Sequence, residues 1–363
     1  MYDPEYLKVI EPMVKAAAAN PPPQPTNCLE VRAVFEALIT HLHPSSVKRS
    51  FRETRIDVPG RNGHVVPLYR FATAEQLARG QNKPQPAVLY IHGGGMICAT
   101  VPLYSDTLAR QTAEFDVQHF AVDYRRAPEA SATDLMDDCY AALAYMSGHA
   151  AELKIDPARI AIAGDSAGGG LATGLALMAR DRALQPPPAK LIAIYSMLDD
   201  RTVQRHPPKG AAGFAPPGTS IADDDAWPKR SALTWNTEMN AMGWAAYLGF
   251  GSPGKDGPIE AASALIKATA SSSPVALPSS ITPYSVPARV DNLAGLPSTY
   301  IEIGSLDLFA EEAVAFAAKL LRDNVDVELR LLSGLPHAYD LMAPAVTAVK
   351  AARETQKRAY NSF

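Results

Sequence analysis

The feature that most constrains the fold is an alternation of short apolar runs with helical patterns, which begins near Pro86. Before residue 200 it predicts strands at Ala87–Ile91, His119–Val122, Ile160–Ala163 and Leu191–Tyr195, with helices at Leu103–Glu114, Asp134–Met146 and Gly168–Asp181. After residue 287 it predicts strands at Thr299–Ile303 and Val327–Leu332, with helices at Leu308–Arg322 and Ala345–Tyr360. Such alternation is typical of βαβ units, so we expect an α/β protein with a mostly parallel central sheet flanked by helices.

Two regions interrupt this alternation. Residues 1–50 hold two expected helices, Pro4–Ala19 and Cys28–Leu42, with a proline-rich breaker between them. Residues 201–287 carry all three tryptophans and are rich in Pro, Gly and Ser, above all over residues 251–287. Because structureless segments longer than about 12–15 residues are uncommon inside a compact domain, we expect 201–287 to be an insertion followed by a mobile loop.

Composition and charge exclude several classes of function. The chain of 363 residues has a net charge of −4 and lacks a Lys/Arg-rich run, so nucleic acid is not an expected partner. The longest apolar stretch, Gly168–Ala179, is shorter than the roughly 20 residues that span a bilayer, and the first residues lack the pattern of a secretion signal. We therefore expect a cytoplasmic protein without stable membrane association. Three scattered cysteines favour neither a disulfide framework nor a zinc site, and no metal or organic cofactor is implied.

The strongest chemical signal is Gly164-Asp165-Ser166-Ala167-Gly168, which follows a predicted strand and opens a predicted helix of small residues. A Gly-x-Ser-x-Gly sequence in this context is typical of a nucleophile elbow, a tight turn that holds the serine in a strained conformation. Side chains in place of the two glycines would collide with the neighbouring strand or helix. Ser166 is therefore the candidate nucleophile, although an ordinary strand-to-helix turn could carry the same residues.

A second glycine motif, His92-Gly93-Gly94-Gly95, also follows an apolar strand. Consecutive glycines let backbone N–H groups point into a cavity without a Cβ in the way, which suits an oxyanion that forms during acyl transfer. This type of loop supplies one half of the oxyanion hole in lipases and esterases. A flexible turn is the alternative, whereas a phosphate cradle would need a following Lys-Ser/Thr or a Gly-x-Gly-x-x-Gly spacing that the chain lacks here.

The candidate base is His337. Enzymes with a nucleophile elbow place the acid and then the base after the serine in sequence, and His206 and His337 are the two histidines that come after Ser166. His206 lies in a Pro- and Lys-rich segment ahead of the later strands. His337 follows the predicted strand Val327–Leu332 directly, which is where a base is expected.

The candidate acid is Asp307, which stands just beyond the predicted strand Thr299–Ile303. Beside His337 it would fix the tautomer of the imidazole and stabilise the imidazolium. Asp307 could also be the N-cap of the helix Leu308–Arg322, a role that is compatible with catalysis. Four other acids compete for the catalytic assignment: Asp199, Asp200, Glu311 and Glu312.

Together these residues resemble the hormone-sensitive-lipase-like family of α/β-hydrolase esterases, over roughly residues 60 to 360. Besides the two glycine motifs, the resemblance rests on Tyr124-Arg125-Arg126-Ala127-Pro128-Glu129, Asp307-Leu308-Phe309 with Glu311, and Pro336-His337. It implies the α/β-hydrolase fold, a catalytic triad of Ser166, Asp307 and His337, and an oxyanion hole built from Gly93, Gly94, Gly95 and Ala167. In that hole Gly94, Gly95 and Ala167 would donate N–H groups while Gly93 shapes the loop.

The family also implies a helical cap over the site. We accordingly divide the chain into N-terminal cap helices (1–50), a first part of the catalytic core (51–200), a cap insertion with a long loop (201–287) and a second part of the core (288–363). The first helix has Tyr6, Leu7, Ile10, Met13 and Val14 spaced for one apolar face. The two N-terminal helices could instead form a homodimer contact or a structural brace.

Two further groups of residues have alternative interpretations. Arg125, Arg126 and Glu129 could bind a substrate carboxylate, but the resemblance favours a structural turn that ties loops together. The three tryptophans could line an acyl or alcohol pocket, or could pack the cap: Trp227, Trp235 and Trp244.

The sequence therefore predicts a serine carboxylesterase that hydrolyses short-chain or small-molecule esters through an acyl-enzyme intermediate. An amidase, a lactonase or a secondary-metabolite acyl hydrolase could use the same residues. A non-catalytic ligand-binding module on this fold is the alternative from another class, and such a protein is expected to lack a triad member.

Overall fold

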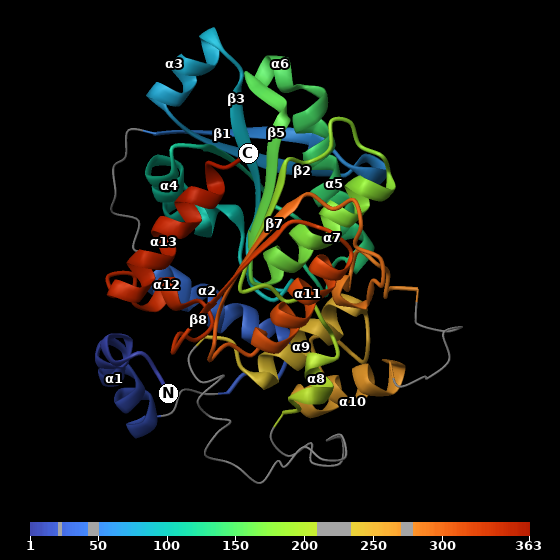
Figure 1. The fold of residues 1–363 in the computed structure, drawn as a ribbon. Coiled ribbons are helices and arrows are strands. Elements are labelled where there is room, and N and C mark those ends of the chain that lie inside the picture. The colour runs from blue at the N-terminus through green and yellow to red at the C-terminus, as the bar shows by residue number, and fades with distance from the viewer. Residues whose placement is uncertain (21–23, 43–50, 209–233, 270–278) are drawn as a thin grey trace.

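The computed structural model describes residues 1–20, 24–42, 51–208, 234–269 and 279–363 (Figure 1). Eight strands form one sheet in the order β1-β2-β4-β3-β5-β6-β7-β8. In chain order they are β1 (Phe51–Pro59), β2 (Val65–Thr73), β3 (Gln85–Ile91), β4 (Gln118–Val122), β5 (Ile155–Asp165), β6 (Lys190–Ile194), β7 (Ser298–Gly304) and β8 (Val327–Leu332). The six strands from β4 to β8 in the sheet order are parallel, which confirms the α/β prediction.

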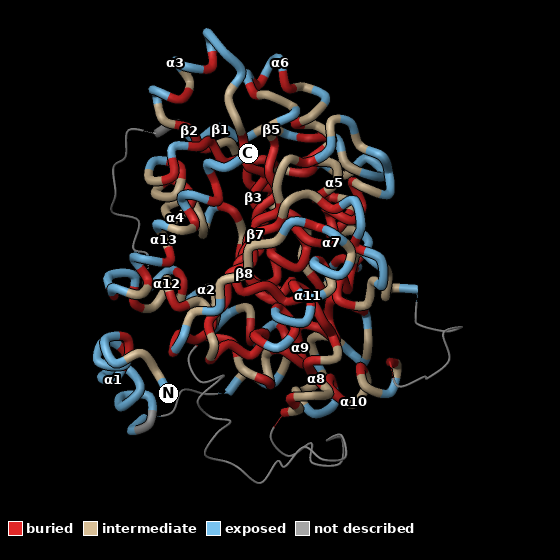
Figure 2. Tube along the Cα trace, viewed as in Figure 1, coloured by how far each residue is buried: buried red, intermediate tan, exposed pale blue. Residues whose placement is uncertain are grey.

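Helices cover both faces of the sheet. Helices α4 (Val101–Phe115) and α13 (Thr347–Tyr360) lie on one face, and α5 (Ala132–Gly148), α7 (Ala167–Asp181) and α11 (Ala310–Arg322) lie on the other (Figure 1). Strands β4, β6 and β7 are buried almost throughout and β3 and β5 over their C-terminal halves, which appear as red tube in the centre of Figure 2. A strand that is covered on both faces reads as a continuous apolar run, which is why β3, β5 and β6 could be recognised in the sequence.

The remaining helices gather mainly near the carboxyl ends of the parallel strands (Figure 1). They are α2 (Cys28–Leu42), α8 (Thr202–Arg205), α9 (Thr237–Leu248), α10 (Pro258–Thr269) and the short α12 (Tyr339–Met342), whereas α3 (Ala74–Asn82) and α6 (Ala150–Leu153) lie at the opposite end. Ligands of open α/β sheets bind at the carboxyl ends of the strands, so these helices surround the expected site. Among the described residues, none of the helices is long and apolar enough to cross a membrane.

The two N-terminal helices have the predicted bounds, and α1 (Pro4–Ala19) is set apart from α2 (Figure 1). The expectation of one apolar face on α1 is correct only in part. Tyr6 and Ile10 are buried, whereas Leu7, Met13 and Val14 are about 40% exposed. Helix α1 contacts the core near its own start, where the Asp3 N–H donates to the Gly334 carbonyl at 3.0 Å.

The structure corrects two other predictions about secondary structure. Strands β1 and β2 pair antiparallel at the edge of the sheet and were not anticipated, because charged residues such as Arg55 and Asp57 interrupt the apolar pattern on the exposed face of β1. The expectation of a long loop over 251–287 is wrong for Pro258–Thr269. These residues form α10, which buries Ala261, Ala262 and Leu265 in packing that includes many contacts with α9.

Candidate active site

Ser166 lies in the turn between β5 and α7 with φ 53° and ψ −122°. Such positive φ values are strained for a residue with a Cβ and persist where the surrounding structure enforces them. The two motif glycines show what enforces this turn. A Cβ at Gly164 would lie 2.3 Å from the Gly168 carbonyl oxygen, and a Cβ at Gly168 would lie 2.0 Å from the Ile91 carbonyl oxygen. The tight approach of β5, α7 and β3 therefore holds Ser166 at the edge of the sheet.

The structure brings the three predicted triad residues together. Nε2 of His337 lies 3.0 Å from Oγ of Ser166, and Nδ1 of His337 lies 2.7 Å from Oδ2 of Asp307. The three side chains are nearly buried, at 6%, 5% and 1% exposure for the serine, histidine and aspartate. They follow the carboxyl ends of β5, β8 and β7, so one edge of the sheet carries a continuous hydrogen-bonded chain from hydroxyl to carboxylate.

The loop carrying His337 is fixed by its neighbours. The Thr234 hydroxyl donates to the His337 carbonyl at 2.9 Å, and the rings of Tyr195 and Phe309 pack edge-on against the imidazole. Asp307 uses its second oxygen, Oδ1, to accept the Phe309 N–H at 2.9 Å. Helix α11 begins at Ala310 with Phe309 as its N-cap, two residues later than predicted, so the N-cap interpretation of Asp307 is wrong.

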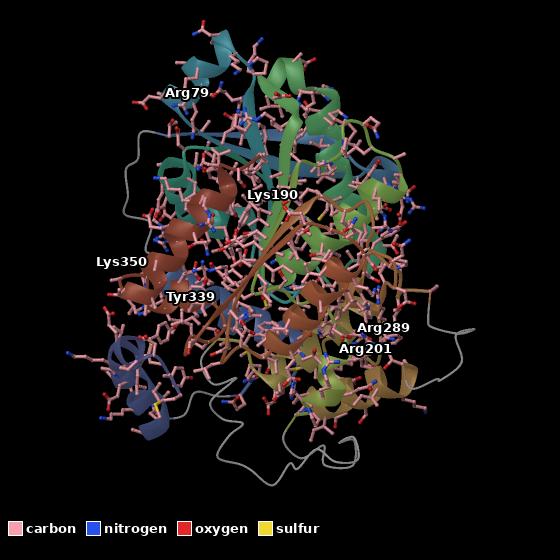
Figure 3. All side chains as sticks on the ribbon, viewed as in Figure 1. Arg79, Lys190, Arg201, Arg289, Tyr339 and Lys350 are labelled. Atoms are coloured by element: carbon pink, nitrogen blue, oxygen red, sulfur yellow. The ribbon has the colours of Figure 1, made fainter. Side chains whose placement is uncertain are left out.

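Two of the competing acids, Asp199 and Asp200, follow β6 and form ion pairs with arginines. Asp199 pairs with Arg201 at 2.7 Å and with Arg205 at 3.1 Å, and Asp200 pairs with Arg289 at 2.7 Å. Figure 3 labels two of these arginines, Arg201 and Arg289, near α11 and well away from Tyr339, which lies two residues after His337. These carboxylates therefore tie loops together and leave the imidazole to Asp307.

The two glutamates of α11 are also engaged elsewhere. Glu312 is buried and accepts the Leu198 N–H at 2.6 Å, while the Glu311 carboxylate lies 3.7 Å from Nε2 of His206. The Glu311 contact engages His206, the other histidine that follows Ser166 in the sequence. Neither glutamate lines the pocket that contains Ser166.

The loop from Gly93 to Gly95 passes beside the serine. Gly94 and Gly95 have φ of 115° and 61°, conformations that glycine adopts readily, and a Cβ on Gly95 would lie 2.0 Å from the Trp235 ring. Gly93 donates its N–H to Oδ1 of Asp165 at 3.1 Å, and this bond anchors the loop. Ala167 is the first residue of α7, and an N–H at this position has no acceptor within its own helix.

Asp165 is a residue of the site whose part in it the sequence did not reveal. This buried carboxylate accepts hydrogen bonds from the hydroxyls of Tyr90, at 2.6 Å, and Tyr104, at 3.1 Å, besides the N–H of Gly93. Burial raises the pKa of Asp165 to about 6, and the nearby Asp340 carboxylate adds to this rise. Its place inside the serine motif was the available signal, but its partners lie 61 to 75 residues away in sequence.

A ring stack supports the start of the glycine loop. The His92 and Tyr124 rings lie 4.3 Å apart, the Tyr124 hydroxyl donates to the His92 carbonyl at 2.8 Å, and Nδ1 of His92 lies 2.8 Å from the Gly93 carbonyl. Burial lowers the pKa of His92, so this ring is neutral near neutral pH. These contacts position the backbone that carries the expected oxyanion donors.

The arginine turn has the structural role that the resemblance favoured. Arg125 pairs with Asp138 at 2.8 Å, and Arg126 pairs with Glu36 of α2 at 2.7 Å. Glu129 pairs with Arg32 of α2, whose guanidinium also donates to the carbonyls of Ile97 and Ala127. The turn thus connects α2 to the segment that follows the glycine loop.

A pocket with about 800 Å³ of space, part of it open to solvent, lies over Ser166 and His337. Helix α2 contributes Phe35, Leu38 and Ile39 to its wall, and α4 contributes Leu103, Tyr104, Thr107, Arg110 and Gln111. Trp235 lines the pocket, whereas Trp244 is buried in α9, so both interpretations of the tryptophans apply. Trp227 lies outside the described residues.

Comparison with known proteins agrees with this geometry. A family model described as alpha/beta hydrolase fold matches residues 88–341. Esterase LipI and carboxylesterase NlhH of Mycobacterium tuberculosis are each 27% identical over 263 residues, which are 72% of this chain and 68% and 69% of those proteins. The solved structure of a bacterial heroin esterase is 28% identical, with a TM-score of 0.73 over 99% of this chain and 96% of that chain.

The chain therefore belongs to the alpha/beta hydrolase fold family. Within this family, the resemblance to hormone-sensitive-lipase-like esterases is confirmed, and the chain is an enzyme of the carboxylic ester hydrolase class.

Proposed function

We propose that the chain is a serine carboxylesterase that hydrolyses short-chain or small-molecule carboxylic esters through an acyl-enzyme intermediate. Ser166 Oγ attacks the ester carbonyl while Nε2 of His337 takes the hydroxyl proton, and that proton then passes to the departing alkoxide. Water, deprotonated by the same nitrogen, attacks the acyl-enzyme and releases the acid and the free serine. Asp307 keeps the imidazole in the required tautomer and stabilises its protonated form.

The N–H groups of Gly94, Gly95 and Ala167 are the proposed donors to the tetrahedral oxyanion, with Gly93 as the anchor of their loop. Donors fixed in advance stabilise a charge that develops in the transition state without the cost of reorganising water. The observation that carries the proposal is the continuous contact from Ser166 through His337 to Asp307, with 3.0 Å and 2.7 Å between the bonded atoms.

The same residues could serve an amidase, a lactonase or a secondary-metabolite acyl hydrolase. The purified full chain should be assayed with p-nitrophenyl acetate, with the anilide p-nitroacetanilide, and with a γ-lactone at matched concentrations. An esterase is expected to release p-nitrophenol at least about a hundredfold faster than p-nitroaniline, because the amide needs a better-placed leaving-group proton. Faster turnover of the anilide or of the lactone would show that the chain is an amidase or a lactonase. A complete absence of turnover would favour a ligand-binding module.

The setting of the enzyme is part of the proposal. We infer a cytoplasmic enzyme that acts on small molecules, with no nucleic-acid partner and no stable membrane association, and a homodimer stays open as an alternative use of the N-terminal helices. Fractionation of the native source and light scattering of the purified chain test these two points.

A further inference from the structure

Asp340 places a carboxylate on the wall of the catalytic pocket, three residues after His337. It lies in the first turn of α12 and is partly buried, and its Oδ1 accepts a hydrogen bond from the Tyr195 hydroxyl at 3.0 Å. Within the described part of the chain, this carboxylate forms no ion pair with a lysine, arginine or histidine. The triad chemistry does not use it, so its charge calls for another explanation.

A second carboxylate, that of Asp165, lines the same pocket. Burial raises the pKa values of Asp165, Tyr104 and Tyr195, and the nearby carboxylate of Asp340 adds to each rise. Charges interact more strongly in a pocket of low polarity than in water. Arg110 also lines the pocket, but it is already engaged in an interaction of its own.

Aromatic rings form much of the remaining wall. Those of Tyr90, Tyr104, Tyr195, Trp235 and Phe35 all line the pocket. The face of an aromatic ring attracts a cation, and the attraction increases when the cation leaves water. A pocket that combines a carboxylate with several aromatic rings has the chemistry that recognises an ammonium group.

We propose that the pocket accepts esters that carry a cationic nitrogen, and that Asp340 is the residue that selects them. The proposal rests on the esterase function given above and names a substrate class for the same site. The cationic group would lie against Asp340 and the Tyr195 ring while the ester carbonyl lies at Ser166. Among esters of a size that the pocket admits, the charge of the substrate is then what the pocket distinguishes.

The test compares esters that differ in charge but have the same shape. In the first pair the charge is on the alcohol part of the ester, and the two esters are acetylcholine and 3,3-dimethylbutyl acetate. In the second pair the charge is on the acyl part, and the two esters are the p-nitrophenyl esters of 4-(trimethylammonio)butanoate and 5,5-dimethylhexanoate. In the wild type we expect kcat/KM for the cationic ester to exceed that of its neutral partner by about tenfold in at least one pair.

The variants separate selection from a structural role. In Asp340→Asn the ratio of cationic to neutral kcat/KM should fall to about one, whereas Asp340→Glu should keep a ratio above one. Glu354→Gln removes an exposed charge on α13 and should leave the ratio as in the wild type. If Asp340 merely supported Tyr195 or His337, its loss would slow both members of a pair equally and the ratio would not change.

A second measurement needs no variant. Choline should inhibit hydrolysis of p-nitrophenyl acetate by the wild type more strongly than 3,3-dimethylbutan-1-ol, its neutral isostere. Ratios of one or below in both wild-type pairs, or a ratio that Asp340→Asn leaves unchanged, would overturn the proposal. So would a preference for anionic hemisuccinate esters, which would transfer selection to Arg110. If the neutral esters are hydrolysed, these outcomes refute only the proposed preference for cationic esters. Failure to hydrolyse any ester would refute the proposed esterase function as well.

Discussion

Gly93 donates its backbone N–H to Oδ1 of Asp165 at 3.1 Å, and this bond links the glycine loop to the residue that precedes the serine. The same carboxylate receives the hydroxyls of Tyr90 and Tyr104. A Cβ on Gly93 would lie 2.6 Å from Oδ2 of Asp165, so the loop and the carboxylate are packed as closely as glycine allows. Asp165 thus positions the loop whose N–H groups we assign to the oxyanion.

Replacing this anchor should affect the transition state more than substrate binding. In Asp165→Asn we expect kcat for p-nitrophenyl acetate to fall about 10- to 100-fold with KM changed by less than about threefold, because loss of one oxyanion donor costs on the order of 10²–10³ and misplacement costs less. Tyr104→Phe removes one hydroxyl contact but keeps the Gly93 bond, and should lose less. An unchanged kcat in Asp165→Asn would show that the glycine loop keeps its conformation without the Asp165 carboxylate.

The raised pKa of Asp165 also predicts how stability varies with pH. Burial raises this pKa from 3.8 to about 6, so folding favours the protonated carboxyl. The stabilisation from protonation is complete at pH values below the pKa of Asp165 in the unfolded chain, and it is lost as the pH rises through the folded-state pKa of about 6. Between about pH 4.5 and about pH 7 the wild type should therefore lose about 2 kcal/mol relative to Asp165→Asn, which is uncharged throughout.

Urea unfolding of the two proteins at several pH values measures this difference. Glu354→Gln, at an exposed position, serves as the control and should follow the wild type. A gap between wild type and Asp165→Asn that stays constant over this range would mean that Asp165 titrates at the same pH in the folded and unfolded chains.

Helix α2 should set the length of the acyl chain that the pocket accepts. Phe35, Leu38 and Ile39 line the pocket, and Ile39 is 4% exposed. With p-nitrophenyl esters from acetate to palmitate, the wild type should be fastest at about two to six carbons, a limit set by enclosed volume. Ile39→Ala should move the optimum to longer chains. Val34 of the same helix is 46% exposed, so Val34→Ala should leave the optimum unchanged. A palmitate optimum in the wild type would show that α2 does not limit the chain length.

The acid of the triad can be separated from the acids that stabilise the fold. Asp307→Asn should fold normally yet lose about 10⁴ in kcat, because the amide favours the wrong tautomer of the imidazole. Asp200→Asn should instead lower the midpoint of thermal unfolding, because Arg289 loses its carboxylate partner, and should keep most of the activity. The opposite pattern, with Asp200→Asn inactive and Asp307→Asn active, would show that the acid is misassigned.

The sequence was sufficient to bring together the residues of the candidate triad, because local patterns and chain order determine those positions. Ser166 lies between a glycine-bounded strand end and a helix start, and each partner follows a recognisable buried strand. Since the carboxyl ends of parallel strands meet at one edge of a sheet, residues 166, 307 and 337 had to converge there. Their separations of 30 and 171 residues in sequence were therefore no obstacle to the prediction.

The parts that the sequence did not reveal depend on contacts without a local pattern. The Tyr195 hydroxyl and Asp340 are 145 residues apart, and neither residue lies in a motif. The sequence favours a loop at helix α10 because the segment is Ala-rich and its surroundings are rich in Ser, Pro, Ala and Gly, whereas the burial of the helix beside α9 is evident only in three dimensions. Strand β1 is also difficult to predict from the sequence, because the charged residues on its exposed face interrupt the apolar pattern of a strand.

The most direct test of the account is the covalent state of Ser166. The wild type, treated with a fluorophosphonate and digested, should carry one phosphonyl group on the peptide that contains Ser166, and should lose its activity toward p-nitrophenyl acetate in proportion. Ser166→Ala should take up no label and should retain a kcat lower by a factor on the order of 10⁶. A label on another serine, or a Ser166→Ala variant that keeps more than about a tenth of the wild-type rate, would contradict the assignment of the nucleophile.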